Sequence, residues 1–562
     1  MNNVSRRTFL TGSATAAATA AAVSTTSAPT ASAAIGVQPV EVPQHPLPFV
    51  HGVASGDPMP ETVILWTRIT PTDEAVPGSG YGPDTKVRWE IATDADFKNI
   101  VKSGEETSKA ESDHTIHVDP YGLKPATEYF YRFTVLDGAH KDAVSPVGRT
   151  KTAPALDADL DKLKFGVASC ANLESGFFAA YGDIAARGRT GELDFLLFLG
   201  DYIYEYARGR YSGMGPYRLN EPENEIVTLT DYRTRYGQYR RDNHLQAAHA
   251  ALPWISVWDD HEVANNDWRE GAENHTNPTE GDYQARRNAA WQAYFEWLPV
   301  RASNPTQGGH IYRSFTFGKL ADFSIMDLRT YRDDDAKALD LIGANDARRT
   351  MLGPDQFEWL KGKLETSTAR WNVLGTSVMF SPMNIATIAR DPNLEPVMQF
   401  LIDHQVGADL ALSAHTAAQT GAGVIVNGDQ WDGYNAERGR ILDILSKHES
   451  KVLFCAGDVH SEWAHKVEYQ GKTVGAELVC SSITSPNVND SLKLPEGNPL
   501  SKIAEDYLKK ANSNVQHVDL DVHGYAVAEI DHDGVNMSFR RVSNLGADDS
   551  AVVDGPFSWR WA

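Results

Sequence analysis

The sequence predicts two domains: a small all-β domain, then a larger layered core of the α/β or α+β class, in which sheets lie between helices. The chain has 562 residues, whereas a single hydrophobic core usually stops growing at about 250–300 residues. Strand-like runs separated by turn residues fill residues 49–150, and short apolar strands alternating with helical patterns fill most of the remainder. This change of pattern favours two domains over one.

Composition and charge narrow the class of protein. Hydrophobic residues make up 41% of the chain, with 13 tryptophans, which is typical of a packed globular protein. The formal net charge of −23 would repel a nucleic-acid backbone, so no stable complex with nucleic acid is expected. Three cysteines allow at most one disulfide bond and exclude a disulfide-stapled scaffold.

Residues 1–33 are typical of a twin-arginine signal peptide. Arg6 and Arg7 stand before a mildly apolar Ala/Thr/Ser stretch, which ends in small residues at Ala33. We therefore expect cleavage after Ala33 and export through the twin-arginine machinery, which gives a secreted, extracellular protein. No other stretch reaches about 18 uninterrupted apolar residues, so no integral membrane segment is expected.

The first domain is expected over residues 46–152 as a small β-sandwich. Its clearest strand-like runs are residues 63–66, 87–91 and 115–118. Alternate residues from Leu123 to Tyr131 are similar to the late strand of a fibronectin type III domain and are interpreted as core. The turn-rich motif at residues 52–58 is interpreted as structural and receives no chemistry.

The second domain is expected over residues 160–545, followed by a C-terminal tail at residues 546–562. Its predicted strands are residues 165–168, 195–199, 254–258, 323–326, 371–374 and 451–454. Its predicted helices include residues 286–297 and 355–365. A further helical segment at residues 499–511 either covers a pocket as a lid or packs on the surface.

Polar side chains follow four of these strands at the point where each strand ends. Cys170 follows the first, Asp201 the second, Asp260 the third and Asp458 the last. Each motif alone reads more readily as a turn, a helix cap or a buried hydrogen bond. Ligands gather at the carboxyl ends of strands in layered folds, so together these carboxylates, histidines, thiol and phenol predict a dinuclear metal site.

These motifs resemble the calcineurin-type metallophosphoesterases, in the variant found in the PhoD family of secreted alkaline phosphatases. The resemblance runs through nearly the whole mature chain, and residues 258–266 are its most specific segment. It implies a β-sandwich core flanked by helices and a site with Fe³⁺ and Ca²⁺. It also implies hydrolysis of phosphomonoesters, and often phosphodiesters, by in-line attack of a metal-bound hydroxide.

The first motif departs from the usual Asp-X-His of metallophosphoesterases, because the strand ends in Cys170. Tyr204 falls three residues after Asp201, which is the spacing seen in purple acid phosphatases. Thiols normally have a pKa of about 8.5 and phenols a pKa of about 10. A cation that binds both in their ionised forms has to be strongly polarising, which favours Fe³⁺. Asp201 would then bridge the two metals, and His460 would give iron an imidazole ligand.

At the second metal position, Asp260 stands where the family pattern usually has Asn, and Asp458 where it usually has His. Carboxylates in place of neutral ligands favour a hard, oxygen-loving cation such as Ca²⁺. His261 would face the phosphoryl group as a hydrogen-bond donor or as the acid to the leaving alkoxide. Asn265 or Asn266 would donate a hydrogen bond to phosphate. A structural role for these asparagines, in a helix cap or a turn, is an equal alternative.

The sequence also offers two candidate arginines for phosphate binding and leaves two alternative functions open. Arg329 and Arg332 are candidates to hold phosphate, although such arginines are more often solvated or paired structurally. A phospholipase D or broad phosphodiesterase, acting on phospholipids among other diesters, would use the same metal site. A secreted binding protein is the other alternative, weakened by the cost of burying carboxylates together without cations.

Overall fold

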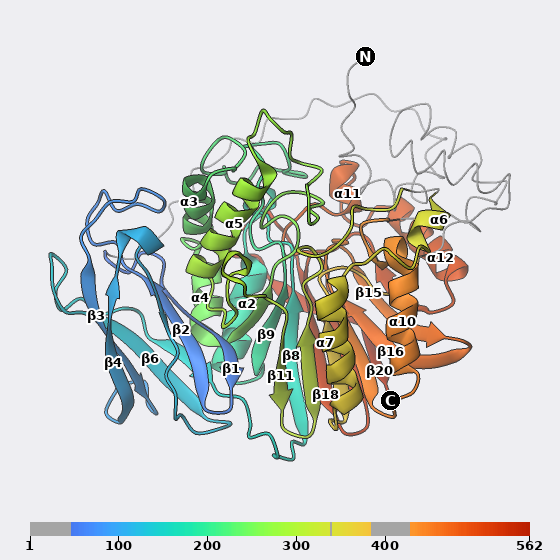
Figure 1. Cartoon of the computed structure of the whole chain (residues 1–562), viewed down its shortest axis with the longest axis horizontal. Coiled ribbons are helices and arrows are strands. Elements are labelled where there is room, and N and C mark those ends of the chain that lie inside the picture. The colour runs from blue at the N-terminus through green and yellow to red at the C-terminus, as the bar shows by residue number, and fades with distance from the viewer. Residues whose placement is uncertain (1–46, 338–339, 384–426) are drawn as a thin grey trace.

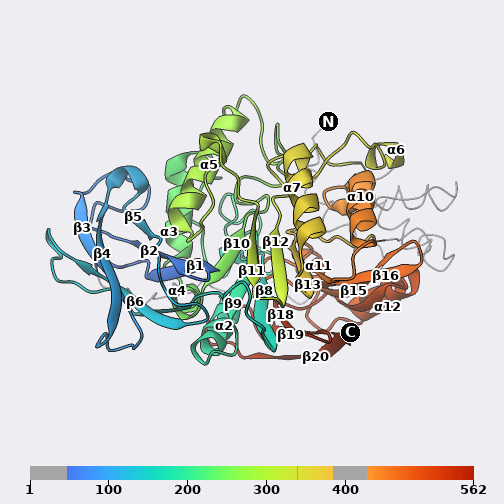
Figure 2. The same cartoon turned by 60° about the horizontal axis from the view of Figure 1, so that its bottom comes forward.

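The computed structural model describes residues 47–337, 340–383 and 427–562, so the predicted signal peptide at residues 1–33 lies outside the described residues. Two large sheets packed face to face form the centre of the molecule, with helices on both outer sides, and a small sheet lies at one end (Figures 1 and 2). The predicted layered class is confirmed, and so is the all-β N-terminal region.

A nine-stranded sheet forms one of the two central layers, in the order β20-β19-β18-β8-β9-β10-β1-β2-β5. Its strands β8, β9 and β10 pair in parallel. The residues of β9 are all buried and apolar, as expected for a strand covered on both faces. The strands are β1 (Val53–Met59), β2 (Thr62–Arg68), β5 (Thr115–Val118), β8 (Lys162–Ala168), β9 (Phe195–Leu199), β10 (Trp254–Val257), β18 (Gly524–Asp531), β19 (Val535–Val542) and β20 (Val552–Trp561).

A seven-stranded sheet forms the facing layer, in the order β11-β12-β13-β14-β16-β15-β17. Aromatic rings fill the interface between the sheets: the ring centroids of Phe165 and Phe323 lie 5.3 Å apart, and those of Phe195 and Phe317 lie 4.9 Å apart. The strands are β11 (Arg313–Phe317), β12 (Ala321–Ile325), β13 (Trp371–Gly375), β14 (Lys451–Ala456), β15 (Glu462–Tyr469), β16 (Lys472–Val479) and β17 (Val515–Asp519).

Helices cover the outer faces of both sheets. Apolar residues of α2, α4 and α5 pack in the core of the nine-stranded sheet, and those of α7 and α10 pack against the seven-stranded sheet. The α-helices are α2 (Ala179–Arg189), α3 (Leu229–Tyr239), α4 (Asn243–Ala251), α5 (Tyr283–Trp297), α6 (Leu341–Ala344), α7 (Gly353–Thr366), α10 (Asn435–Leu445), α11 (Val488–Ser491) and α12 (Pro499–Ala511). The 3₁₀ helices are η3 (Ala110–Ser112), η4 (Leu173–Ser175), η5 (Pro305–Gln307) and η6 (Trp431–Tyr434).

The N-terminal region is joined to the larger domain through a shared sheet. Strands β3 (Thr85–Ala92), β4 (Ile100–Ser108), β6 (Glu128–Val135) and β7 (Gly148–Lys151) form a separate four-stranded sheet. In contrast, β1 pairs in parallel with β10, with Gly56 opposite Trp254, so β1, β2 and β5 extend the nine-stranded sheet. A side chain at Gly56 would meet the carbonyl oxygen of Pro299. The turn-rich motif therefore lies at the junction between the domains.

The C-terminus also differs from the sequence interpretation. Residues 546–562 were expected to form a tail outside the second domain, whereas residues 552–561 form β20 and pair with β19. Phe557, Trp559 and Trp561 pack against the main core. Gly555 and Pro556 interrupt the strand pattern in the sequence, which explains the difference.

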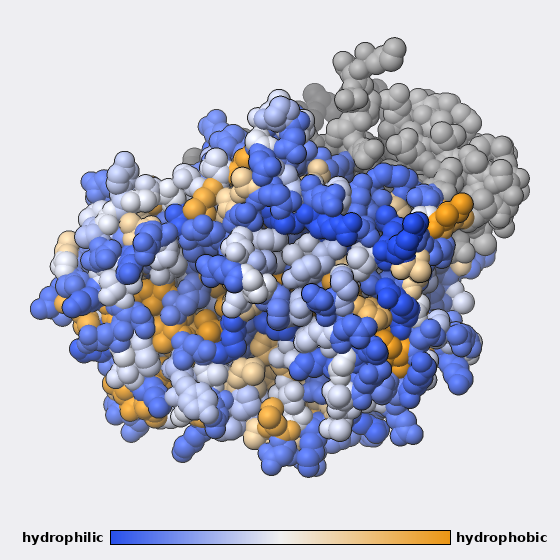
Figure 3. Space-filling model, in the orientation of Figure 1, coloured by the Kyte–Doolittle hydropathy of each residue, from blue (hydrophilic) through white to orange (hydrophobic). Residues whose placement is uncertain are grey.

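The described surface is mainly hydrophilic on the face seen in Figure 3, with apolar residues in separate patches. Within residues 47–337, 340–383 and 427–562, no helix combines the length and apolar character needed to cross a bilayer. Helix α12 packs against β17, with Ala504 and Leu508 buried.

Candidate metal centre

The loops that follow β8, β9 and β10 of one large sheet and β14 of the other converge on one region at the carboxyl ends of these strands. Several turn residues there have left-handed backbone angles that are uncommon for residues other than glycine: φ is 61° at Cys170, 59° at Asp201, 67° at Asp458 and 51° at His460. Strained backbone of this kind collects at functional sites and persists only where the surrounding structure holds it.

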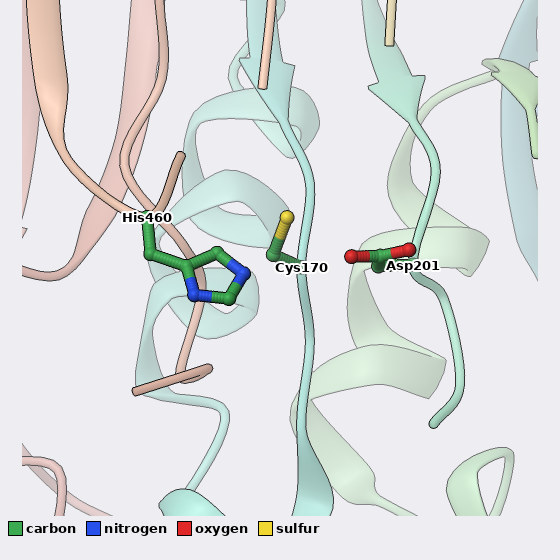
Figure 4. Close-up of side chains that lie close together, drawn as sticks. All are labelled: Cys170, Asp201 and His460. Carbon is green, nitrogen blue, oxygen red and sulfur yellow. The ribbon is translucent and has the colours of Figure 1, made fainter. Parts of the chain in front are cut away.

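Cys170, Asp201 and His460 form a first group, which we call the cysteine cluster; one potential ligand atom of each lies within 4.8 Å of those of the others. In Figure 4 the thiol of Cys170 lies between the carboxylate of Asp201 and the imidazole of His460. The Tyr204 hydroxyl belongs to the same place, because it donates to Asp201 Oδ2 at 2.9 Å and lies 3.3 Å from His460 Nε2. The structure thus brings together the four residues predicted for iron.

The imidazole of His460 has the form that a metal ligand requires. Burial lowers its pKa to about 4, so the ring is neutral at pH 7. Its Nδ1 lies 2.8 Å from the carbonyl oxygen of Pro486, which can only accept, so the single ring proton is on Nδ1. Nε2 therefore presents its lone pair to the cysteine cluster.

Asp259, Asp260 and Asp458 form a second group with the same spacing, which we call the carboxylate cluster. A third group joins Asp201, Asp260 and His261, so Asp201 and Asp260 connect the two clusters. The residues predicted for calcium therefore lie together, and beside the cysteine cluster. The sequence interpretation did not include Asp259 among the ligands.

The titration of these side chains fits a site built for cations. Burial raises the pKa of the Cys170 thiol and of the Tyr204 phenol well above their usual values, and the Asp201 carboxylate adds to both shifts. Burial, followed by repulsion from Asp259 and other carboxylates, likewise raises the pKa of Asp458. Bound cations would remove this penalty by stabilising the ionised forms.

Two buried oxygen atoms without hydrogen bonds also indicate a cation site. Asp260 Oδ1 and Asn266 Oδ1 are buried and have no hydrogen-bond partner in the described part of the chain. A buried acceptor without a partner is costly, and a cation with many oxygen ligands would satisfy both atoms. The residues present therefore fit metal ions.

His261 is held from behind by a carboxylate that the sequence interpretation missed. Its Nδ1 lies 2.7 Å from Oε2 of the fully buried Glu205. Burial opposes a charge on the ring, but Asp260, Glu205 and Asp201 raise the pKa of His261 well above its usual value. Glu205 follows Tyr204 directly in the sequence, so the motif contained it, but nothing in the spacing pointed to His261.

The two asparagines proposed for phosphate are engaged with another carboxylate. Asn265 Nδ2 and Asn266 Nδ2 donate to Glu273 Oε2 at 3.0 and 2.9 Å. The backbone N–H of Asn266 donates to Asp260 Oδ2 at 2.7 Å, which fixes this loop to the site. One donor of each amide is thus used inside the protein.

The two candidate arginines are ion-paired. Arg329 donates from Nε to Asp259 Oδ1 at 2.5 Å and from Nη2 to Asp259 Oδ2 at 3.0 Å. Its Nη1 donates to Asp429 Oδ1 at 2.9 Å, and Arg332 pairs with Asp429 as well. The structural alternative that the sequence favoured is therefore the one observed, and the two arginines balance part of the negative charge of the carboxylate cluster.

Glu262 is a second carboxylate that the sequence interpretation missed, and it connects two of the loops that form the site. Glu262 accepts hydrogen bonds from the backbone N–H groups of Asp201 at 3.0 Å, Tyr202 at 2.6 Å and Asp259 at 2.8 Å. It therefore ties the turn after β9 to the turn after β10. No local pattern distinguishes such a residue from a surface glutamate before the loops are placed together.

Comparisons with known proteins agree with this arrangement. A PhoD-like phosphatase family model matches residues 165–539, and a model of the PhoD-like phosphatase N-terminal domain matches residues 33–154. Alkaline phosphatase D of Bacillus subtilis (strain 168) is 38% identical over 499 residues, covering 85% of this chain and 75% of the relative. A solved structure of PhoD has a TM-score of 0.75 and 34% identity, covering 90% of this chain and 89% of that one. A purple acid phosphatase from yellow lupin (Lupinus luteus) seeds shares the fold, with a TM-score of 0.50 and 10% identity over 90% of this chain and 73% of that one.

Proposed function

Because the chain belongs to the PhoD-like phosphatase family, and is a phosphatase, we propose that it hydrolyses phosphomonoesters and also phosphodiesters at the site described above. The observation that carries the proposal is the overlap of the three groups, in which Asp201 and Asp260 connect the cysteine and carboxylate clusters. Two cation positions that share carboxylates suit in-line attack on a phosphoryl group. The family resemblance drawn from the sequence is confirmed.

Fe³⁺ is the cation that we assign to the cysteine cluster together with Tyr204. A thiol and a phenol whose pKa values are raised by burial need a strongly polarising cation to ionise. Ca²⁺ is assigned to the carboxylate cluster, because Asp260 and Asp458 offer oxygen ligands and Asp260 Oδ1 has no hydrogen-bond partner among the described residues.

When bound, the cations would activate a water molecule as nucleophile and neutralise the charge of the phosphoryl oxygens. His261 supplies the proton. Its Nδ1 is occupied by Glu205, so Nε2 is the ring nitrogen available to the oxygen of the departing alcohol. No side chain is required as a nucleophile.

Secretion through the twin-arginine pathway is part of the proposal and rests on Arg6, Arg7 and the small-residue end of residues 1–33. Replacement of both arginines by lysine should leave the precursor inside the cell. Normal levels of mature double-lysine protein outside the cell would contradict this assignment.

The test of the activity combines metal analysis of the purified protein with turnover of matched mono- and diesters of one alcohol. We expect iron and calcium in the protein and release of that alcohol from both esters. Turnover of the monoester alone would remove the diesterase part of the proposal. Full activity with neither metal bound would contradict the assignment of both cations.

A further inference from the structure

One imidazole, that of His523, holds both ends of the loop from Ser482 to Asp490. His523 Nδ1 lies 2.9 Å from Ser482 Oγ, at the start of the loop. At the other end, His523 Nε2 lies 2.9 Å from Asp490 Oδ2 and 3.1 Å from Asn487 Nδ2. His523 is 7% exposed and comes directly before β18, and the backbone N–H of Val542 on β19 donates to its carbonyl at 2.9 Å. The ring is therefore fixed to the nine-stranded sheet.

These contacts occupy both nitrogens of the His523 ring. Ser482 Oγ, which donates to the carbonyl oxygen of Ser485 at 2.6 Å, is held against Nδ1 of His523. The Asp490 carboxylate accepts from Nε2–H. Burial opposes ionisation of this carboxyl, yet its interaction with the neighbouring His523 lowers the pKa of Asp490 below its usual value. His523 thus contacts one end of the loop with each ring nitrogen.

The loop that His523 closes carries the backbone contacts of the cysteine cluster. The carbonyl oxygen of Cys170 accepts from Ser485 Oγ at 2.9 Å, from Ser485 N at 3.2 Å and from Thr484 N at 3.3 Å. The Pro486 carbonyl accepts from His460 Nδ1 at 2.8 Å and so sets the ring orientation of His460. Two members of the cluster, both with left-handed backbone angles, are thus held by three consecutive loop residues.

We propose that His523 is a positioning residue for the cysteine cluster, which acts by fixing the 482–490 loop that holds Cys170 and His460. The inference rests on the proposed function in one respect, namely that the cysteine cluster binds a cation. Backbone strain at Cys170 and His460 has to be held by surrounding structure, and the loop that His523 braces contacts both residues. In the described residues, the hydrogen bonds of loop residues 482–487 reach Cys170 and His460, and also the flanking Ser169 and Asn172, but none of Asp259, Asp260 and Asp458. Loss of the brace should therefore weaken one metal position selectively.

The test compares His523→Ala with a matched variant, His517→Ala. His517 on β17 is 8% exposed and pairs with a buried carboxylate, with Nε2 at 3.1 Å from Glu462 Oε2. It therefore matches His523 in burial and in the loss of a contact with a carboxylate, but it has no hydrogen bond to the loop. Each protein is loaded with metal, dialysed against a graded series of chelator concentrations, and analysed for iron and calcium content, visible absorption and Tm.

We expect His523→Ala to retain the metal of the cysteine cluster about tenfold less tightly, as for other residues that orient metal ligands, with an altered absorption spectrum and unchanged calcium. His517→Ala should keep the wild-type content of both metals and the wild-type spectrum. Asp490→Asn, which keeps the shape of the contact and removes its charge, should shift retention in the same direction by a smaller factor.

Wild-type metal retention and absorption in His523→Ala, at a Tm no lower than that of His517→Ala, would overturn the inference while leaving the proposed function intact. Equal loss of iron and calcium would overturn the selectivity on which it rests. If His523→Ala does not fold, Asp490→Asn decides by the same measurements. A wild-type protein that binds no metal at the cysteine cluster would overturn the proposed function itself, and the inference with it.

Discussion

The carboxylate of Glu205 orients the imidazole of His261 and anchors the loop beyond it. Its Oε2 lies 2.7 Å from His261 Nδ1, while its Oε1 accepts from the backbone N–H of Asn265 at 3.0 Å and from Asn274 Nδ2 at 2.6 Å. The carboxylate is fully buried. One side chain therefore fixes both the ring of His261 and the loop that carries the asparagines.

Glu205→Gln should lower turnover without releasing metal, because the amide keeps the size of the side chain and loses the charge that holds His261. We expect a loss of about tenfold in kcat, smaller than the 10²- to 10⁴-fold typical of a lost proton donor. In a His261→Ala background the same change should cost little, since the two residues act as a unit. Equal losses in both backgrounds would contradict the coupling.

His261→Ala should keep near-normal metal content and lose about 10²- to 10⁴-fold in turnover. An alkyl phosphate should suffer more than a nitrophenyl phosphate, because only the alkoxide needs a proton as it leaves. Paired kcat measurements on the two esters check this. Equal losses would instead indicate that His261 stabilises phosphoryl charge, and no loss for either ester would place the chemistry elsewhere.

The strand-end motifs were predictable because buried apolar strands such as β9 have a strong local signal, and polar residues placed directly after them stand out. The residues that contact these motifs could not be predicted from the sequence. Glu205 and Glu262 act through contacts with residues about 60 positions away, such as Asn265 and Asp201, and such pairing has no local pattern. The pairing of Gly56 with Trp254, which merges the two predicted domains into one sheet, is of the same kind.

Tyr204→Phe and Cys170→Ser should each change a visible charge-transfer absorption of the purified protein, if Fe³⁺ binds the phenolate and thiolate. Cys455→Ser is the matched control, because Cys455 is a buried thiol in β14 outside the clusters. Its absorption should equal that of the wild type. A colourless, fully active wild-type protein that contains only zinc or magnesium would contradict the assignment of iron.

Removal of calcium should abolish activity, and Ca²⁺ should restore it better than Zn²⁺, because a carboxylate-rich site suits a large hard cation. Asp260→Asn and Asp458→Asn should both weaken this restoration. Asp113→Asn provides the control: Asp113 is also buried, but it pairs with Arg68 in the N-terminal region, away from the three metal-ligand groups. Calcium titration of activity measures each variant, and full wild-type activity without calcium would refute the prediction.

The last prediction concerns the junction at which the N-terminal region joins the large sheet. Asp57, in the turn-rich motif, is fully buried and accepts from Arg313 Nε at 2.8 Å, Arg313 Nη2 at 2.7 Å and Arg301 N at 2.7 Å. Asp57→Ala would leave the guanidinium of Arg313, 12% exposed, without its carboxylate partner. Removal of one partner from a buried pair typically costs about 3–5 kcal/mol, so the free energy of unfolding should fall by that amount in denaturant titrations.

Asp96→Ala, which removes the exposed partner of Lys98, should leave the unfolding midpoint unchanged. Because Asp57 lies outside the metal-ligand groups, metal content should stay at the wild-type level. An Asp57→Ala protein as stable as the wild type would show that the Asp57–Arg313 pair does not stabilise the junction.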